Sequence, residues 1–141
     1  MAGGPSAEAE SCVFCGIVAH RTPAHILLED ESTVAFLDLF PWSRGHLLVV
    51  PKVHKARLTD LSFELQTALL RTLGEMCRRT ERLTPNYNLG LNAGRPAGQV
   101  VPHVHFHIIP RYGEIDPFRS GAREPLSDAD ARALLRELGP S

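Results

Sequence analysis

A chain of 141 residues, 43% of them hydrophobic, can build one packed core but is too short for two independent domains. Its formal net charge is −1, with lysine and arginine interspersed among acidic residues, which excludes a basic groove for nucleic acid and leaves a small molecule as the expected ligand. The N-terminus has neither a basic start nor an apolar run, and no later stretch reaches membrane-spanning length, so we expect a cytoplasmic protein, with the nucleus as an alternative, and no membrane partner.

Residues 1–51 predict a tail followed by three strands. Residues 1–10 are small and polar, so we expect a disordered tail that cannot bury enough apolar surface to offset the entropy of ordering. Two apolar runs, at residues 26–28 and 34–39, flank an acidic turn and predict a pair of strands. A third strand is expected at residues 47–50, closed by Pro51.

The middle of the chain predicts one long helix and two further strands. Apolar residues recur at spacings of three and four over residues 62–82, with Ser62 as the expected N-cap. Strands are expected at residues 87–91 and 100–110, and residues 92–98, which include two glycines and a proline, form the loop between them. Glycines in this loop would let backbone amides approach an anion.

Residues 127–138 predict a short C-terminal helix after a loop-like stretch. The pattern as a whole predicts an α+β fold with an antiparallel sheet. We expect three parts, namely a tail at residues 1–10, one domain at residues 11–112, and a C-terminal loop and helix at residues 113–141 that pack on or near the domain.

Three histidines, His103, His105 and His107, alternate with apolar residues in the last predicted strand. Because side chains alternate across a strand, the imidazoles share one face and the apolar side chains pack on the core. Three imidazoles make a poor core, since every ring nitrogen needs a partner. A single histidine on a strand is more often structural, but three beside a glycine-rich loop predict a functional cleft.

Two chemistries fit such a row. All three rings could bind a metal, as in zinc hydrolases, or one ring could attack as a nucleophile with the others in support. The residues alone leave both open. However, the segment HVHFHIIPR at residues 103–111, the loop NAGRPAGQVVP before it and VVPKVH at residues 49–54 resemble the signature of the histidine-triad (HIT) superfamily, in particular its Hint-like nucleoside phosphoramidases. The resemblance extends over residues 12–111.

The resemblance implies an α+β fold, commonly a homodimer, with a purine nucleotide pocket at the histidine strand. By match to the middle histidine of the motif, His105 would be the nucleophile that attacks the α-phosphorus. His107 would contact phosphate oxygens or help protonate the leaving group, and His103 completes the triad. The implied product is AMP, released from adenosine 5'-monophosphoramidates and related compounds through a covalent nucleotidyl-histidine.

Other residues match positions that bind the nucleotide in this family. Asp38 resembles the ribose-binding carboxylate, although alone it would be assigned to a turn. Val100 stands where many relatives have Ser or Thr, so a hydroxyl donor is missing, only the backbone amide remains there, and substrate preference and rate stay open. The remaining matches are the base-binding walls Phe14, Ile17, Phe36 and Leu39, whose alternative is ordinary core, and the phosphate-site loop residues Asn92, Gly98 and Gln99, whose amides could instead stabilise a turn.

Cys12 and Cys15 form a CxxC pair in a chain with an odd number of cysteines, three, which favours metal or redox chemistry over a disulfide. Adding His54 and His103 gives two sulfurs and two nitrogens, which suit closed tetrahedral zinc. The resemblance supports this set, because zinc-bearing histidine-triad proteins use the corresponding four residues. We expect a structural zinc site, the alternative being buried thiols with His54 hydrogen-bonded in the cleft.

Other functions remain open from the sequence. Within the superfamily, the alternatives are a Fhit-like dinucleoside polyphosphate hydrolase and, more distantly, a nucleotidyl transferase. Outside it, they are a zinc hydrolase that uses all three strand histidines and a non-catalytic nucleotide-binding module. The leaving group, the base preference and the dimer interface are not readable from the sequence, although Trp42 and the face of the long helix are candidate interface positions.

Overall fold

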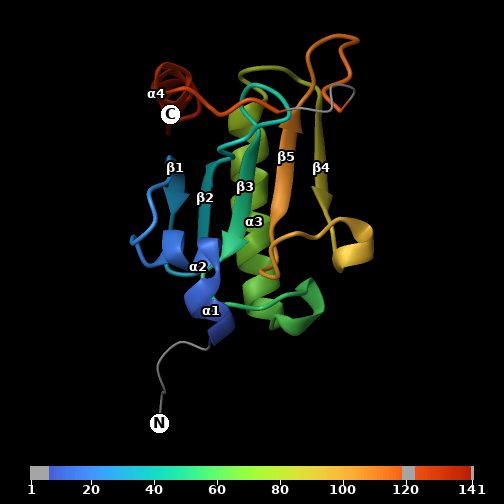
Figure 1. Cartoon of the computed structure of the whole chain (residues 1–141). Coiled ribbons are helices and arrows are strands. Elements are labelled where there is room, and N and C mark those ends of the chain that lie inside the picture. Colours follow the sequence, from blue (N-terminus) through green and yellow to red (C-terminus); the bar gives the residue numbers. More distant parts are fainter. Residues whose placement is uncertain (1–6, 119–122, 141) are drawn as a thin grey trace.

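The computed structural model describes residues 7–118 and 123–140, which form one five-stranded antiparallel sheet with helices on both faces (Figure 1). The strands lie in the order β1-β2-β3-β5-β4. Their bounds are Ile26–Glu29 for β1, Thr33–Leu37 for β2, Leu47–Pro51 for β3, Tyr87–Leu91 for β4 and Phe106–Pro110 for β5. The helices are α1 Ala7–Ser11, α2 Val13–Val18, α3 Phe63–Thr80 and α4 Asp128–Glu137, with short 3-10 turns at η1 Leu58–Asp60 and η2 Arg95–Ala97. The predicted α+β class with an antiparallel sheet is confirmed.

Each face of the sheet carries a hydrophobic core. On one face, α3 packs side chains such as Leu69 and Met76 against Ala35 and Val49 of the sheet. On the other face, α2 packs Phe14 and Ile17 against Val34, Phe36, Leu48 and Val50. Because both faces are covered, β2 and β3 are buried along their whole length, which explains why every residue of the two strands except Thr33 is apolar.

The long helix begins and ends where its sequence pattern predicts. The Ser62 hydroxyl accepts a hydrogen bond from the Leu65 amide at 3.2 Å, which satisfies one of the free donors of the first turn. Near its end, the buried Arg79 guanidinium donates to the carbonyls of Leu27 and Leu138, so it ties β1 and the end of α4 to α3. In the described part of the chain, no helix is both long and apolar enough to cross a membrane.

The C-terminal helix belongs to the same core. Ala131, Leu134 and Leu138 are almost fully buried with the side chains of α3. Ahead of α4, the Leu126 amide donates to the Leu39 carbonyl at 2.8 Å, which brings the C-terminal segment to the end of β2. This contact places residues near 123–126 beside the site described below.

Two segments differ from the sequence expectation. Residues 7–10 belong to α1 instead of a disordered tail, with Ala9 buried, while residues 1–6 lie outside the described residues. The last strand begins at Phe106 instead of residue 100. Pro102 has no amide proton for a ladder, and the His103 amide turns back to the Val101 carbonyl at 2.8 Å. The first two histidines of the triad therefore precede the strand.

Candidate active site and metal centre

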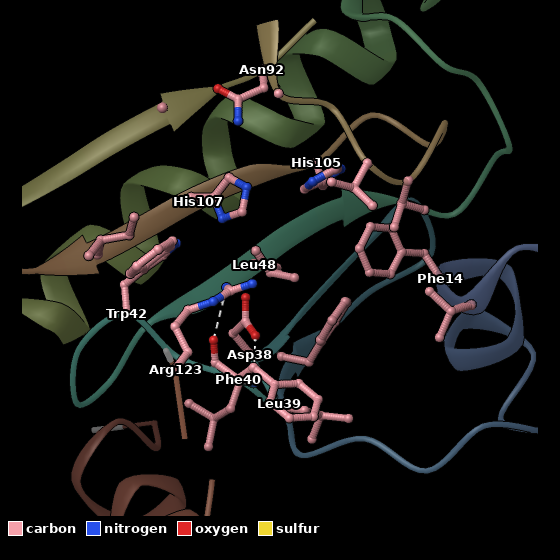
Figure 2. Close-up of a pocket in the computed structure, with 18 of the residues that line it drawn as sticks. Phe14, Asp38, Leu39, Phe40, Trp42, Leu48, Asn92, His105, His107 and Arg123 are labelled. Atoms are coloured by element: carbon pink, nitrogen blue, oxygen red, sulfur yellow. Dashed lines mark hydrogen bonds between the residues drawn. The ribbon is translucent and has the colours of Figure 1, made fainter. Parts of the chain in front are cut away.

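A pocket of about 640 Å³ opens between the sheet, α2, the loop after β4 and the C-terminal segment (Figure 2). His105 and His107 line it, although His103 does not. The alternation expected from the sequence holds in space, because Val104 and Ile108 enter the core on the α3 face while the histidine rings lie on the other. The other predicted residues that line it are Phe14, Ile17, Phe36, Asp38, Leu39, Asn92, Gly98 and Val100.

His105 has one ring nitrogen tied to the backbone and the other left for chemistry. Its Nδ1–H donates to the His103 carbonyl at 2.7 Å, so the neutral ring carries its lone pair on Nε2. The Phe14 ring packs edge-on against it, with ring centroids 5.0 Å apart. Burial lowers the pKa of His105, which favours the neutral ring. Neutral imidazole with a free Nε2 lone pair is the form that can attack phosphorus.

His107 is set in the opposite tautomer by a chain of hydrogen bonds. The Trp42 amide donates to Nδ1 of His46 at 3.0 Å, so neutral His46 carries its proton on Nε2. That Nε2–H donates to Nδ1 of His107 at 3.0 Å. His107 must then carry its own proton on Nε2, as a donor available to the pocket. Burial lowers the pKa of His107 to about 4 and that of His46 to about 3, so the chain stays neutral.

Asp38 closes this network from the end of β2. One carboxylate oxygen accepts the Phe40 amide at 2.8 Å, and the other lies 3.5 Å from Nε2 of His46. Burial raises the pKa of Asp38. Asp38, His46 and His107 offer ligand atoms within 4.8 Å of one another. With Nε2 of His46 already protonated and donating, this group is a hydrogen-bonded network.

The loop after β4 brings only part of its predicted set to the pocket. Gly98 has φ +99°, and a Cβ there would lie 3.2 Å from Nδ2 of Asn92, so the position requires glycine. Val100 is 88% exposed at the pocket mouth. Gln99 does not line the pocket, contrary to its predicted role. Its buried amide accepts from the Gly94 amide and donates to the Ala56 and Val101 carbonyls, so it shapes the loop.

Sequence reasoning missed several residues of the site. His46 gave no signal, because a single histidine at the start of a strand is usually structural. Trp42, considered only as an interface position, lines the pocket with Phe118, and their rings pack edge-on at 5.3 Å. Arg123, from a stretch that looks like an ordinary loop, lies over the Trp42 ring at 4.6 Å.

The four predicted metal ligands converge next to His105. Ligand atoms of Cys12, Cys15, His54 and His103 all lie within 4.8 Å of one another. The Nε2–H of His103 donates to the Pro51 carbonyl at 2.8 Å, so its Nδ1 lone pair faces both cysteines. That Nδ1 lies 3.5 Å from each sulfur, and Nδ1 of His54 lies 3.2 Å from the Cys15 sulfur.

These distances fit zinc. Bonds of about 2.3 Å to sulfur and about 2.0 Å to nitrogen at tetrahedral angles separate the two kinds of ligand atom by about 3.5 Å. Burial raises the pKa of the Cys15 thiol to about 11, so a bound cation would be needed to hold its thiolate form. Two thiolates and two imidazole nitrogens form a closed set with no position for a reactive water.

Comparison with known proteins identifies the family. The HIT domain profile matches residues 19–114. The chain belongs to the HIT domain family. A relative from Schizosaccharomyces pombe, named adenosine 5'-monophosphoramidase, is 41% identical over 91% of this chain and 96% of its own length. The protein of the same name from Candida albicans is 35% identical over 90% of this chain and 88% of its own length.

Solved structures agree with this assignment of the HIT protein. A zinc-bound histidine triad family protein from Mycobacterium smegmatis superposes with a TM-score of 0.76 at 36% identity, covering 92% of this chain and 94% of the other. A histidine triad nucleotide-binding protein from Sulfolobus tokodaii gives a TM-score of 0.81 at 30% identity, covering 90% and 89%. The predicted family and fold are confirmed.

Proposed function

We propose that this HIT protein hydrolyses purine nucleoside 5'-phosphoramidates to the nucleoside monophosphate, in the manner of an adenosine 5'-monophosphoramidase. Its named relatives support an enzyme of this kind. The observation that carries the proposal is the pair of opposite tautomers at the pocket, a free lone pair on Nε2 of His105 and a proton on Nε2 of His107. A nucleophile and a hydrogen-bond donor then face the same space.

The nucleotide fits the pocket in one orientation. The apolar end formed by Phe14, Ile17 and Phe36 suits a purine base. Asp38, two residues after Phe36 at the end of β2, lines the same pocket, and its carboxylate can accept from ribose hydroxyls. The phosphate then lies at His105 and His107, with the loop at Asn92 and Gly98 close to its oxygens.

The proposed reaction has two displacements at phosphorus. Nε2 of neutral His105 forms a bond to phosphorus while the bond from phosphorus to the amine nitrogen breaks, and the amine takes one proton from solvent as it leaves. The His107 Nε2–H donates to a phosphate oxygen or to the departing nitrogen, a contribution commonly worth a few kcal/mol per donor. Water then attacks phosphorus, the bond to His105 breaks, and one proton is released with the nucleoside monophosphate.

The metal centre supports this chemistry without entering it. Cys12, Cys15, His54 and His103 would hold zinc, which supplies a structural link between the N-terminal helices and the segment that carries His105. A zinc hydrolase that uses all three triad histidines is disfavoured. Nε2 of His103 is bonded to Pro51 and Nδ1 of His105 to the backbone, and the described ligand clusters do not join the three rings.

The protein is further proposed to act as a homodimer through the β4 edge. β4 is an edge strand, and its central residues are exposed. On α3, the side chain of Phe63 is 86% exposed and that of Leu70 is 69% exposed. The two residues are seven positions apart, and the same spacing leads to Cys77, whose side chain is hydrogen-bonded to Tyr87 of β4. One stripe of apolar side chains therefore flanks an open strand edge, as in interfaces that join two sheets.

The cytoplasmic location, with the nucleus as an alternative, stays a prediction.

Acid-quench mass spectrometry during turnover of adenosine 5'-monophosphoramidate tests the function. The expected result is an AMP adduct on the peptide that contains His105, absent in His105→Asn, together with loss of nearly all turnover in that variant. Diadenosine triphosphate, compared by kcat/KM, separates the dinucleotide hydrolase alternative. Wild-type turnover by His105→Asn contradicts the proposal, and AMP binding without hydrolysis of either compound assigns a nucleotide-binding module instead.

A further inference from the structure

The pocket has two ends with different chemistry, and the catalytic histidines lie between them. At one end, Phe14 contacts the His105 ring. At the other, Trp42 leads through His46 to His107. Figure 2 shows Phe14 and Trp42 on opposite sides of the two histidines. If the base occupies the Phe14 end, as the proposed function requires, the leaving group is left with the Trp42 end.

The Trp42 end is lined by aromatic rings and one cation. Trp42 and Phe118 supply the rings, and the Arg123 guanidinium lies over the face of Trp42 at 4.6 Å. Arg123 is the single lysine or arginine among the described residues that line the pocket. Burial is the main cause of the low pKa of His46 and His107, and the Arg123 charge lowers both further, as it also opposes the raised pKa of Asp38. Arg123 and His107 line the same pocket, so the guanidinium is close enough to act on a phosphate held at His107.

Arg123 has donors to spare for a ligand. Its Nη1 donates to the Phe40 carbonyl at 3.0 Å, which anchors the side chain (Figure 2). A guanidinium carries five N–H donors in a planar fork, of which this contact uses one. The stacking on Trp42 and the anchor on Phe40 together fix the plane of the fork, as suits recognition of a carboxylate or phosphate.

We propose that Arg123 selects substrates whose leaving group is negatively charged, above all an amine that carries a carboxylate, with Trp42 and Phe118 accepting its apolar part. This inference rests on the proposed function. The competing explanation is a structural pin, in which Arg123 only fastens the C-terminal segment to Phe40. The two differ in one respect, since a pin is indifferent to the charge of the leaving group.

A matched pair of substrates isolates that charge. Phenylalanine and phenylalaninamide, each joined through the α-amino group to adenosine 5'-monophosphate, differ only in carboxylate against carboxamide. We expect kcat/KM to favour the carboxylate by about fivefold or more, between the strength of an exposed ion pair and that of a charge-assisted hydrogen bond. Arg123→Gln brings the ratio close to one, and Arg123→Lys restores part of it.

Arg44→Gln is the control, because it removes a cation that pairs with Glu137 and does not line the pocket. It should keep the wild-type ratio. An equal ratio in the wild type and Arg123→Gln overturns the inference and leaves the hydrolase intact. If Arg123→Gln lowers kcat/KM only for diadenosine triphosphate, whose leaving group is ADP, Arg123 recognises a phosphate. That result overturns the proposed selection of a carboxylate.

Binding measured on His105→Asn keeps the test independent of turnover. Calorimetric titration of the two phenylalanine compounds should give a Kd ratio of similar size that vanishes in the double variant with Arg123→Gln. If neither compound is hydrolysed but this ratio is found, the proposed function fails and the charge recognition stands. If both are hydrolysed and the Kd values are equal, the recognition fails alone.

Discussion

Acidification should destabilise this fold through His46, which is 1% exposed and has no charged form that the core can accommodate. Burial lowers its pKa to about 3 in the folded chain, against an ordinary value of 6.5 in the unfolded chain. The unfolded state therefore binds the proton first as pH falls, so stability is full above pH 6.5 and is lost progressively toward pH 3. At about 1.4 kcal/mol per pH unit, His46 alone should cost about 2 kcal/mol between pH 7 and pH 5.

Urea unfolding of the wild type and His46→Asn at pH 7 and pH 5 measures this contribution. Asparagine keeps an acceptor for the Trp42 amide but does not titrate. The variant retains all four metal ligands, so zinc at equal concentration affects both chains alike. We expect the free energy of unfolding to fall by about 2 kcal/mol more in the wild type over this interval. An equal decrease of the free energy of unfolding in both chains would show that His46 is not held neutral. The tautomer assigned to His107, which depends on neutral His46, would then also be wrong.

Two further predictions concern the metal and the dimer. Cys15→Ser should abolish stoichiometric zinc in elemental analysis and lower the Tm. The control, Cys77→Ser, removes a thiol of α3 that lies outside the cluster and should keep the metal. Equal zinc content in the two variants would contradict the proposed metal site. Leu70→Glu should convert a dimer to a monomer in light scattering because it charges the α3 stripe, while Ile115→Glu, at a side chain 71% exposed elsewhere, should leave the mass unchanged. A dimer that persists in Leu70→Glu assigns the interface to another face.

The sequence predicted the fold correctly where the local residue pattern and the tertiary packing favour the same structure. The long helix shows apolar spacing and a serine cap, and both survive in the structure because one face of α3 is the core. The last strand was predicted too long, since six residues before Phe106 look extended in sequence. Their direction is decided by Pro102 and by long-range bonds, such as that from the Val104 amide to the Lys55 carbonyl at 2.7 Å. No pattern within the strand reports such a partner.

The sequence predicted those site residues whose types and spacing are unusual, and it missed those that are common in any loop. Three histidines at period two and a CxxC pair are rare enough to suggest chemistry. Arg123 and Phe118 are common residues in an irregular segment, and they reach the pocket only because Leu126 and Arg123 bond to backbone carbonyls after β2. Gln99 was assigned to the phosphate site by resemblance to the family, but its side chain bonds to Gly94, Ala56 and Val101 and does not line the pocket. Its burial could not be foreseen without the loop's path.

The three triad histidines start as chemically identical rings, and the partner of one nitrogen decides the role of each. The Pro51 carbonyl turns the lone pair of His103 toward the cysteines, the His103 carbonyl turns that of His105 toward the pocket, and His46 turns the proton of His107 there. The peptide group of His103 thus links a candidate metal ligand to His105, the proposed nucleophile. Since residues 103–105 lie outside the strand, a metal that fixes the His103 ring also fixes the carbonyl that holds His105. A zinc ion held by Cys12, Cys15, His54 and His103 would in this way help to orient the His105 ring, which we propose as the nucleophile, without contacting the phosphate.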